Sequence, residues 1–149
     1  MIIYNKANNI MIKIMLQAAE NFCTHQIRLP YTVNDQATKL KTFIASIDID
    51  LDNGKKYKVY IAAENGFIQK VSKLFLEEDE SDEETLIDMA LETTNLIVGS
   101  AKVIAEDSNQ FVIGTPNFLK IDYLNFDYDN IKSIKIDNDE LIIAIKEID

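Results

Sequence analysis

Glu92, Asn95 and Gly99 lie one helical turn apart and are the part of this sequence best suited to contact another molecule. Their spacings of three and four place a carboxylate and an amide on one side of a helix, beside a position without a side chain. Asparagine and glycine are poor helix formers, glycine by about 1 kcal/mol relative to alanine. These residue types alone name no reaction. They predict either the solvent side of an ordinary amphipathic helix or a contact face for a partner.

A long helix must carry these three residues. We expect it to begin near Asp82 and to end at about Asp107, because apolar residues recur at helical spacing through this stretch. Ser81 and Glu84 fit a capping box, in which each side chain accepts a hydrogen bond from the other residue's backbone N–H. The acidic run 77–84 reads mainly as a solvated loop, and its last carboxylates suit the positive end of the helix dipole.

Projection of this helix at about 3.6 residues per turn separates two faces. A polar stripe collects Thr85, Asp88, Glu92, Asn95, Gly99, Lys102 and Glu106. The apolar remainder collects Leu86, Ile87, Ala90, Leu91, Thr94, Ile97, Val98, Ala101 and Ile104. We expect the apolar face to pack on a sheet and the polar stripe to face outward, with Glu92 and Asn95 adjacent.

The remaining sequence predicts an α+β fold, in which two or three helices pack on an antiparallel sheet. Helical spacing is found over residues 8–24 and 66–76. Asn65 and Gly66 could instead form a hairpin turn, but the apolar spacing after them favours a helix. Alternating or β-rich stretches predict strands over 27–33, 42–51, 55–63, 110–119, 123–128, 131–136 and 140–148. Turn signals at 52–54 and 137–139 predict two hairpins.

Length and composition indicate a single domain over residues 1–149 with a globular core. Of the 149 residues, 47% are hydrophobic, which is too many for a disordered chain. No apolar run approaches the roughly 20 residues that a membrane span needs, and the N-terminus lacks the layout of a signal peptide. A net charge of -10 argues against nucleic acid and against an anionic membrane as partners. A protein partner or a small ligand remains.

The other reactive side chains point to no site. Cys23 is the only cysteine, which excludes an internal disulfide and makes the cytoplasm the expected compartment. His25, the only histidine, is expected at the end of the first helix, where a cation interacts well with the helix dipole. No set of metal ligands is visible, and a chain with 4 glycines is not expected to hold a nucleotide.

The long helix resembles the motif helix of the CheX/CheC group of chemotaxis phosphatases. Members carry Glu-x-x-Asn on a long surface helix, within a frame that the segment DMALETTNLIVGSAK matches. In register are Asp88, Glu92, Asn95, Gly99, Ala101 and Lys102. Leu91 stands where glycine is common in the family, and Ser100 where asparagine is common. The order of elements is also similar, and a single motif makes the chain CheX-like rather than CheC-like.

The resemblance implies an aspartyl-phosphate phosphatase that acts on a CheY-type response regulator. Asn95 would place the attacking water, since an amide donates and accepts hydrogen bonds without titrating. Glu92 would anchor the receiver domain through its active-site lysine. Asp88, Gly99 and Lys102 would lie at the contact with the receiver. No cofactor is expected in this chain, because the receiver brings its own Mg²⁺.

Two other functions remain open. The first is a non-catalytic adaptor that binds a receiver or another signalling protein through the same helix, for which the departures at Leu91 and Ser100 leave room. The second is a protein that only dimerises, since family members of this length can pair through their sheets and the last hairpin offers an exposed edge. A homodimer is therefore among the expected assemblies.

Overall fold

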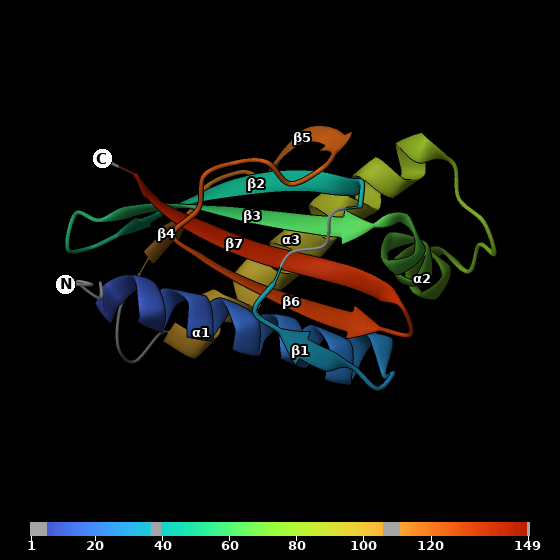
Figure 1. Cartoon of the computed structure of the whole chain (residues 1–149), viewed down its shortest axis with the longest axis horizontal. Helices are drawn as coiled ribbons and strands as arrows, with labels where there is room; N and C mark the ends of the chain where they lie inside the picture. The colour runs from blue at the N-terminus through green and yellow to red at the C-terminus, as the bar shows by residue number, and fades with distance from the viewer. Residues whose placement is uncertain (1–5, 37–39, 106–110, 149) are drawn as a thin grey trace.

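The computed structural model confirms an α+β fold built on one antiparallel sheet (Figure 1). It describes residues 6–36, 40–105 and 111–148. Six of its seven strands follow the order β1-β6-β7-β3-β2-β4, and the seventh, β5, also pairs with β2. Their bounds are β1 Thr32–Asn34, β2 Thr42–Leu51, β3 Lys56–Glu64, β4 Phe111–Ile113, β5 Asn117–Asp122, β6 Asn130–Ile136 and β7 Asp139–Ile148.

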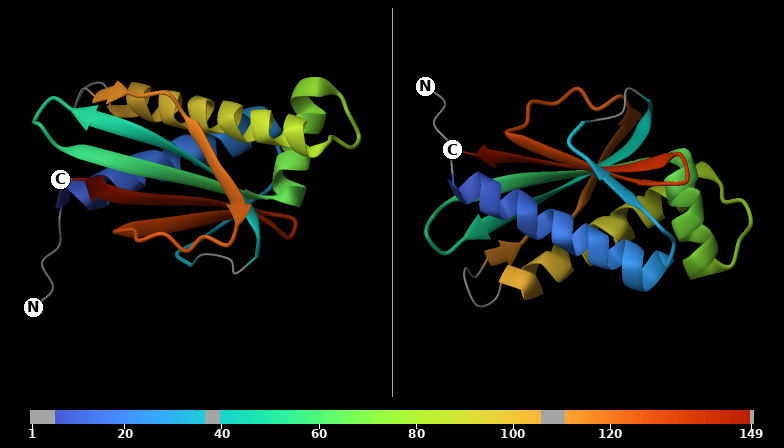
Figure 2. Two further views of the ribbon diagram at one scale, coloured as in Figure 1. Left: turned by 90° about the horizontal axis from the view of Figure 1, so that it is seen from above. Right: turned by 60° about the horizontal axis from the view of Figure 1, so that its bottom comes forward.

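The described residues form three α-helices, α1 (Lys6–Phe22), α2 (Asn65–Leu76) and α3 (Glu83–Ala105). Helices α1 and α3 lie side by side on one face of the sheet (Figure 2). Helix α1 packs over β6 and β7, and α3 packs over β2. Helix α2 lies at one end of the sheet, where it contacts α3, β3 and β7. The sheet therefore buries one face of α3 along most of its length.

The structure confirms the second predicted helix and extends the first one. Helix α2 starts at Asn65, which confirms a helix there rather than a hairpin. Helix α1 does not stop near residue 24 but continues into a π-turn, Cys23–Ile27, that ends on Arg28 in the left-handed conformation with φ 61°. The backbone N–H of Arg28 donates to the carbonyl of Cys23 at 2.7 Å and closes this turn.

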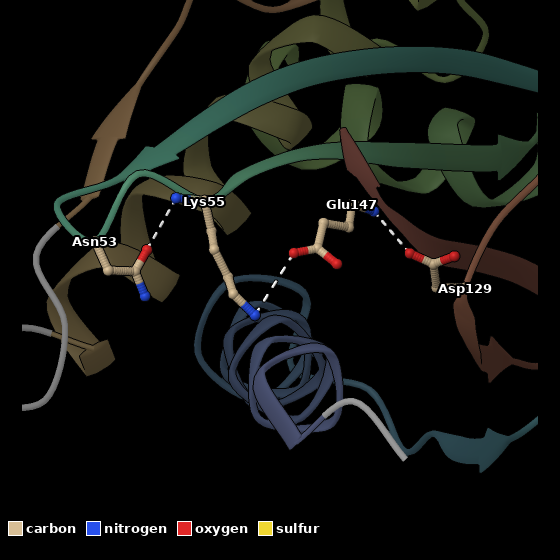
Figure 3. Close-up of polar contacts among 4 residues, drawn as sticks. All are labelled: Asn53, Lys55, Asp129 and Glu147. Atoms are coloured by element: carbon tan, nitrogen blue, oxygen red, sulfur yellow. Dashed lines mark hydrogen bonds and ion pairs between the residues drawn. The ribbon is translucent and has the colours of Figure 1, made fainter. Parts of the chain in front are cut away.

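The predicted turn between β2 and β3 is confirmed, and side chains tie it to β7 (Figure 3). Gly54 takes a φ of 90°, which favours glycine, and Asn53 Oδ1 accepts a hydrogen bond from the Lys55 N–H at 2.9 Å. Lys55 Nζ lies 3.6 Å from Glu147 Oε1. The Glu147 N–H donates to Asp129 Oδ2 at 2.7 Å. The Lys55–Glu147 ion pair thus links the hairpin to β7, and the bond to Asp129 links β7 to the residue that precedes β6.

The sheet has a large hydrophobic core beneath the helices and a small one on its other face. The second cluster consists of Ile44, Tyr60, Ala62, Ile142 and Ala144. Leu124 and Phe126 pack on it, with the rings of Phe126 and Tyr60 stacked at 4.9 Å between centroids. The strand expected over 123–128 is therefore wrong: β5 already occupies the edge of β2, and this segment covers the outer face instead.

The order of the strands also corrects the expectation about the sheet edges. Strand β7 lies between β6 and β3, and β1 pairs with β6 over Ser133–Lys135, so the last hairpin is not a fully exposed edge. The first predicted strand is reduced to Thr32–Asn34, after Pro30. The stretch 110–119 is divided into β4 and β5 around Pro116. The homodimer itself stays a prediction.

Candidate functional site

The start of helix α3 is capped by Asp82 rather than by the predicted box of Ser81 and Glu84. Asp82 Oδ1 accepts a hydrogen bond from the Thr85 N–H at 2.9 Å, which is the N-cap geometry. This bond lowers the pKa of the Asp82 carboxyl below its ordinary value. The capping-box prediction was wrong because tertiary contacts claim the Ser81 side chain first.

Ser81 is buried and fastens the acidic segment to helix α2. Its hydroxyl is hydrogen-bonded to the Ser72 hydroxyl and donates to Glu78 Oε2 at 2.8 Å. Gln69 accepts from the Ser81 N–H at 3.0 Å and donates to its carbonyl at 3.1 Å. This network fixes where the chain turns from α2 into α3, and with it the position of the polar stripe.

The outward stripe of α3 is confirmed in the described residues. Asp88, Glu92, Asn95 and Lys102 are exposed, while Thr85 and Gly99 are half-buried. Glu106 lies outside the described residues. On the opposite side the buried residues are Leu86, Ala90, Thr93, Thr94, Ile97, Val98, Ala101 and Ala105. Three of the residues expected to be buried, Ile87, Leu91 and Ile104, are only half-buried.

Glu92 and Asn95 are neighbours with free polar groups. At a spacing of three their Cβ atoms are about 5–6 Å apart on a helix. Neither side chain makes a hydrogen bond or an ion pair with another described residue. The turn that carries them is anchored by burial of Thr93 and Thr94, whose hydroxyls donate to the carbonyls of residues 89 and 90 at 2.7 and 2.8 Å. The pair is thus an exposed carboxylate and amide on a helix that is packed against the core.

Gly99 faces open space. A Cβ built at this position would meet no heavy atom within 4 Å. No internal contact therefore requires glycine here, although glycine costs about 1 kcal/mol relative to alanine inside a helix. Packing within the described structure therefore gives no reason for glycine beside Asn95.

Charge is unevenly distributed along the same face. Glu83, Glu84, Asp88 and Glu92 are exposed on the N-terminal half of α3, and Lys102 is exposed near its other end. Ten residues separate Glu92 from Lys102, which is about 15 Å along a helix axis. A partner would meet a mainly acidic surface with a single cation at one end of the described helix.

Sequence reasoning missed two exposed apolar residues beside the stripe. Leu96 is 38% exposed and Val103 is 69% exposed. The projection of the helix assigned neither residue to the polar stripe or to the buried face. Leu96 follows Glu92 by four and Val103 follows Gly99 by four, so the projection already contained the signal. Leu96 also lines a small groove between α3 and the end of α1. Contact with a partner here would therefore combine polar and apolar groups.

The reactive residues outside α3 form no site in the described structure. Cys23 is buried, and desolvation with the nearby charge of Glu20 raises the pKa of its thiol to about 12, which makes it unreactive at neutral pH. His25 is exposed in the π-turn. Among residues 6–36, 40–105 and 111–148, no group of three or more His, Cys, Asp or Glu could hold a metal ion. No helix in those ranges is long and apolar enough to cross a membrane.

Solved structures share this fold along nearly the whole chain. The CheX protein of Vibrio vulnificus has a TM-score of 0.74 at 17% identity, over 93% of this chain and 99% of that one. CheX in the CheX-CheY-BeF3-Mg complex of Borrelia burgdorferi has a TM-score of 0.65 at 16% identity, over 91% and 97%. The middle domain of FliM from Vibrio alginolyticus has 0.55 at 10% identity, over 92% and 90%. At these identities the likeness shows the fold alone.

The family is shown by the sequence itself. No curated protein matches the chain significantly. The family model described as chemotaxis phosphatase CheX matches residues 45–137, which is more than half of the chain and includes all of α3. With its fold and its motif helix in the order that this family has, the chain belongs to the CheX family of chemotaxis phosphatases.

Proposed function

We propose that this protein hydrolyses the phospho-aspartate of a CheY-type receiver domain, with Asn95 and Glu92 as the catalytic pair. The observation that carries the proposal is this exposed pair, which has no partner in the described chain and stands on a helix held by the sheet in a member of the CheX family. Its geometry suits insertion into another protein's active site rather than a pocket of its own.

The reaction needs little from this chain beyond positioning. A water oxygen attacks the phosphorus, the bond from phosphorus to the aspartyl oxygen breaks, and inorganic phosphate and the free carboxylate are formed. Asn95 hydrogen-bonds the water and holds it in line with the leaving carboxylate, and it needs no charge to do so. The receiver supplies the Mg²⁺ that neutralises the phosphoryl oxygens.

Glu92 binds the receiver next to that water. Its carboxylate, one turn before Asn95, pairs with the lysine of the receiver's active site and sets the register of the two proteins. Gly99 allows the receiver backbone to approach the helix, while Asp88 and Lys102 lie at the rim of the contact. The CheX-CheY-BeF3-Mg complex of Borrelia burgdorferi, in which a related fold is bound to CheY, supports this choice of partner.

The test is phosphate release from a phosphorylated CheY-type receiver mixed with purified protein. We expect the wild type to accelerate release and the Glu92→Ala, Asn95→Ala double variant to leave it at the receiver's own rate. Equal rates for the two proteins would refute the phosphatase. Capture of the receiver by both wild type and Asn95→Ala, without phosphate release by either, would instead establish the non-catalytic adaptor.

Two further parts of the proposal concern the setting of the reaction. We place the protein in the cytoplasm, where receivers and their kinases meet. A homodimer remains part of the proposal, and light scattering of the purified chain tests it. If the purified chain is a monomer and retains phosphatase activity, the homodimer is refuted and the proposed catalytic pair stands.

A further inference from the structure

A groove runs beside the catalytic face, between α3 and the end of α1. Leu96 and Ser100 form its wall on α3, and Ala18, Asn21 and Phe22 form the opposite wall on α1. Its volume is about 230 Å³. Ligand pockets for whole small molecules usually measure about 300–1,000 Å³, so this groove suits a single large side chain rather than a cofactor.

The groove is continuous with the row of residues that contains Glu92. Glu92, Leu96 and Ser100 follow one another at a spacing of four, so they form one line along the helix surface. Leu96 directly follows Asn95, and Ser100 directly follows Gly99. A protein that contacts Glu92 and Asn95 can therefore contact the groove at the same time.

The groove differs in charge from its surroundings. The chain carries a net charge of -10, and Glu83, Glu84 and Asp88 are exposed further along the same helix. No Asp, Glu, Lys or Arg lines the groove, whose polar groups are the side chains of Asn21, His25, Gln26 and Ser100. The half-exposed Leu96 adds apolar surface. This chemistry selects an uncharged side chain with apolar surface.

The backbone at the end of α1 shapes the groove. His25 and Gln26 belong to the π-turn Cys23–Ile27, in which Cys23 and Ile27 are buried. π-turns are rare and are frequently found at functional sites. This one ends on Arg28 at φ 61°, a conformation that residues other than glycine adopt rarely. The unusual turn brings two more side chains to the edge of the groove.

We infer that this groove is a second docking point for the receiver, and that it accepts an uncharged, apolar or aromatic side chain from a loop beside the receiver's phosphorylation site. The inference rests on the proposed function. Leu96, on the α3 wall of the groove, acts in the choice of receiver and not in the chemistry. Contacts of this kind lower KM, because they bind the phosphorylated receiver and the transition state equally.

The test places a charge in the groove without touching the catalytic pair. In Leu96→Lys we expect the KM for the phosphorylated receiver to rise about tenfold, with kcat within about twofold of wild type. Leu96→Met, which keeps the apolar surface, should restore the wild-type KM. The matched control is Val33→Lys on the edge strand β1, since Val33 is 39% exposed and Leu96 is 38% exposed. A KM for Leu96→Lys within twofold of wild type would overturn the inference.

A binding measurement separates this inference from the phosphatase proposal. The probe is the receiver loaded with beryllofluoride and Mg²⁺, titrated into wild type, Leu96→Lys and Val33→Lys. If wild type binds but releases no phosphate, weaker binding by Leu96→Lys alone supports the groove while the phosphatase fails. Equal binding by all three proteins overturns the groove. Absence of binding to every receiver in a panel of CheY-type domains overturns both.

Discussion

Two glycines in this protein stand in opposite environments. Gly66, in the first turn of α2, packs against the hairpin between β6 and β7, and a Cβ there would clash with the Asp139 carboxylate. Gly99, in the middle of α3, would meet nothing within 4 Å. Both occur at helical positions where alanine would be the better helix former. The first glycine is explained inside the molecule, and the second is not.

The difference is between a part of the molecule that maintains the fold and a part whose proposed role is contact with a partner. Asp139 stays beside Gly66 because it is paired with Lys70 of α2. On α3 the side chains of Glu92 and Asn95 have no comparable contact with any described residue. Substitutions at the start of α2 should therefore change stability, while those on the outer face of α3 should change activity.

The largest effect should come from Asn95. We expect Asn95→Ala to lower kcat/KM for phosphate release from a receiver by at least about 100-fold, or about 2.7 kcal/mol of transition-state stabilisation, because the water loses its orienting amide. The melting temperature should stay within about 2 °C of wild type. Gln17→Ala, which removes an exposed amide from α1, is the control. Wild-type activity in Asn95→Ala would show that the outer face of α3 does not act through Asn95 in phosphate release.

The next effect concerns the start of α2. We expect Gly66→Ala to lower the free energy of unfolding by about 1 kcal/mol or less, since the new methyl group must displace the Asp139 carboxylate from its pairing with Lys70, while the better helix propensity of alanine offsets part of that loss. Chemical denaturation measures this loss, and phosphatase activity should be unchanged under native conditions.

A double-variant cycle isolates the cause of that loss. In an Asp139→Ala background the carboxylate is absent, so Gly66→Ala should become neutral or slightly stabilising. An undiminished loss in that background would show that the contact with Asp139 does not explain Gly66.

An effect of opposite sign is expected at Gly99. Gly99→Ala should raise the free energy of unfolding by about 0.5–1 kcal/mol, because alanine favours the helix and its methyl group enters open space. The same variant should weaken binding of the beryllofluoride-loaded receiver by several-fold, measured by titration. A variant that is more stable and binds as tightly as wild type would contradict a close approach at this position.

The smallest effect is a pH dependence at the start of α3. Hydrogen bonding from the Thr85 N–H lowers the pKa of Asp82 from 3.8 in the folded protein. The cap therefore stabilises the fold above that value and is lost as the pH falls through and below it. The gap in melting temperature between wild type and Asp82→Ala should thus narrow on acidification from pH 7. The control is Glu83→Ala, which lacks this bond, and a constant gap would contradict the cap.

Local pattern was enough to place the elements that carry the candidate site. The helical spacing of 85–105 predicted both the outward stripe and the buried face of α3, because a helix surface repeats over three or four residues. Alternation predicted β2 and β3 for the same reason, as side chains on a strand point to alternate faces. The motif residues on α3 are likewise defined by spacing along one helix and not by contacts between elements.

Tertiary contacts decided the rest. Ser81 did not cap α3 because α2 binds its side chain, and residues 123–128 did not form a strand because they cover the outer face of the sheet. The groove beside Leu96 and the partner of Gly66 join segments distant in the chain. The sequence by itself thus determined which polar residues face outward on the motif helix. Only the tertiary structure decided which of them have partners within the chain, because such contacts depend on packing between elements rather than on spacing along one.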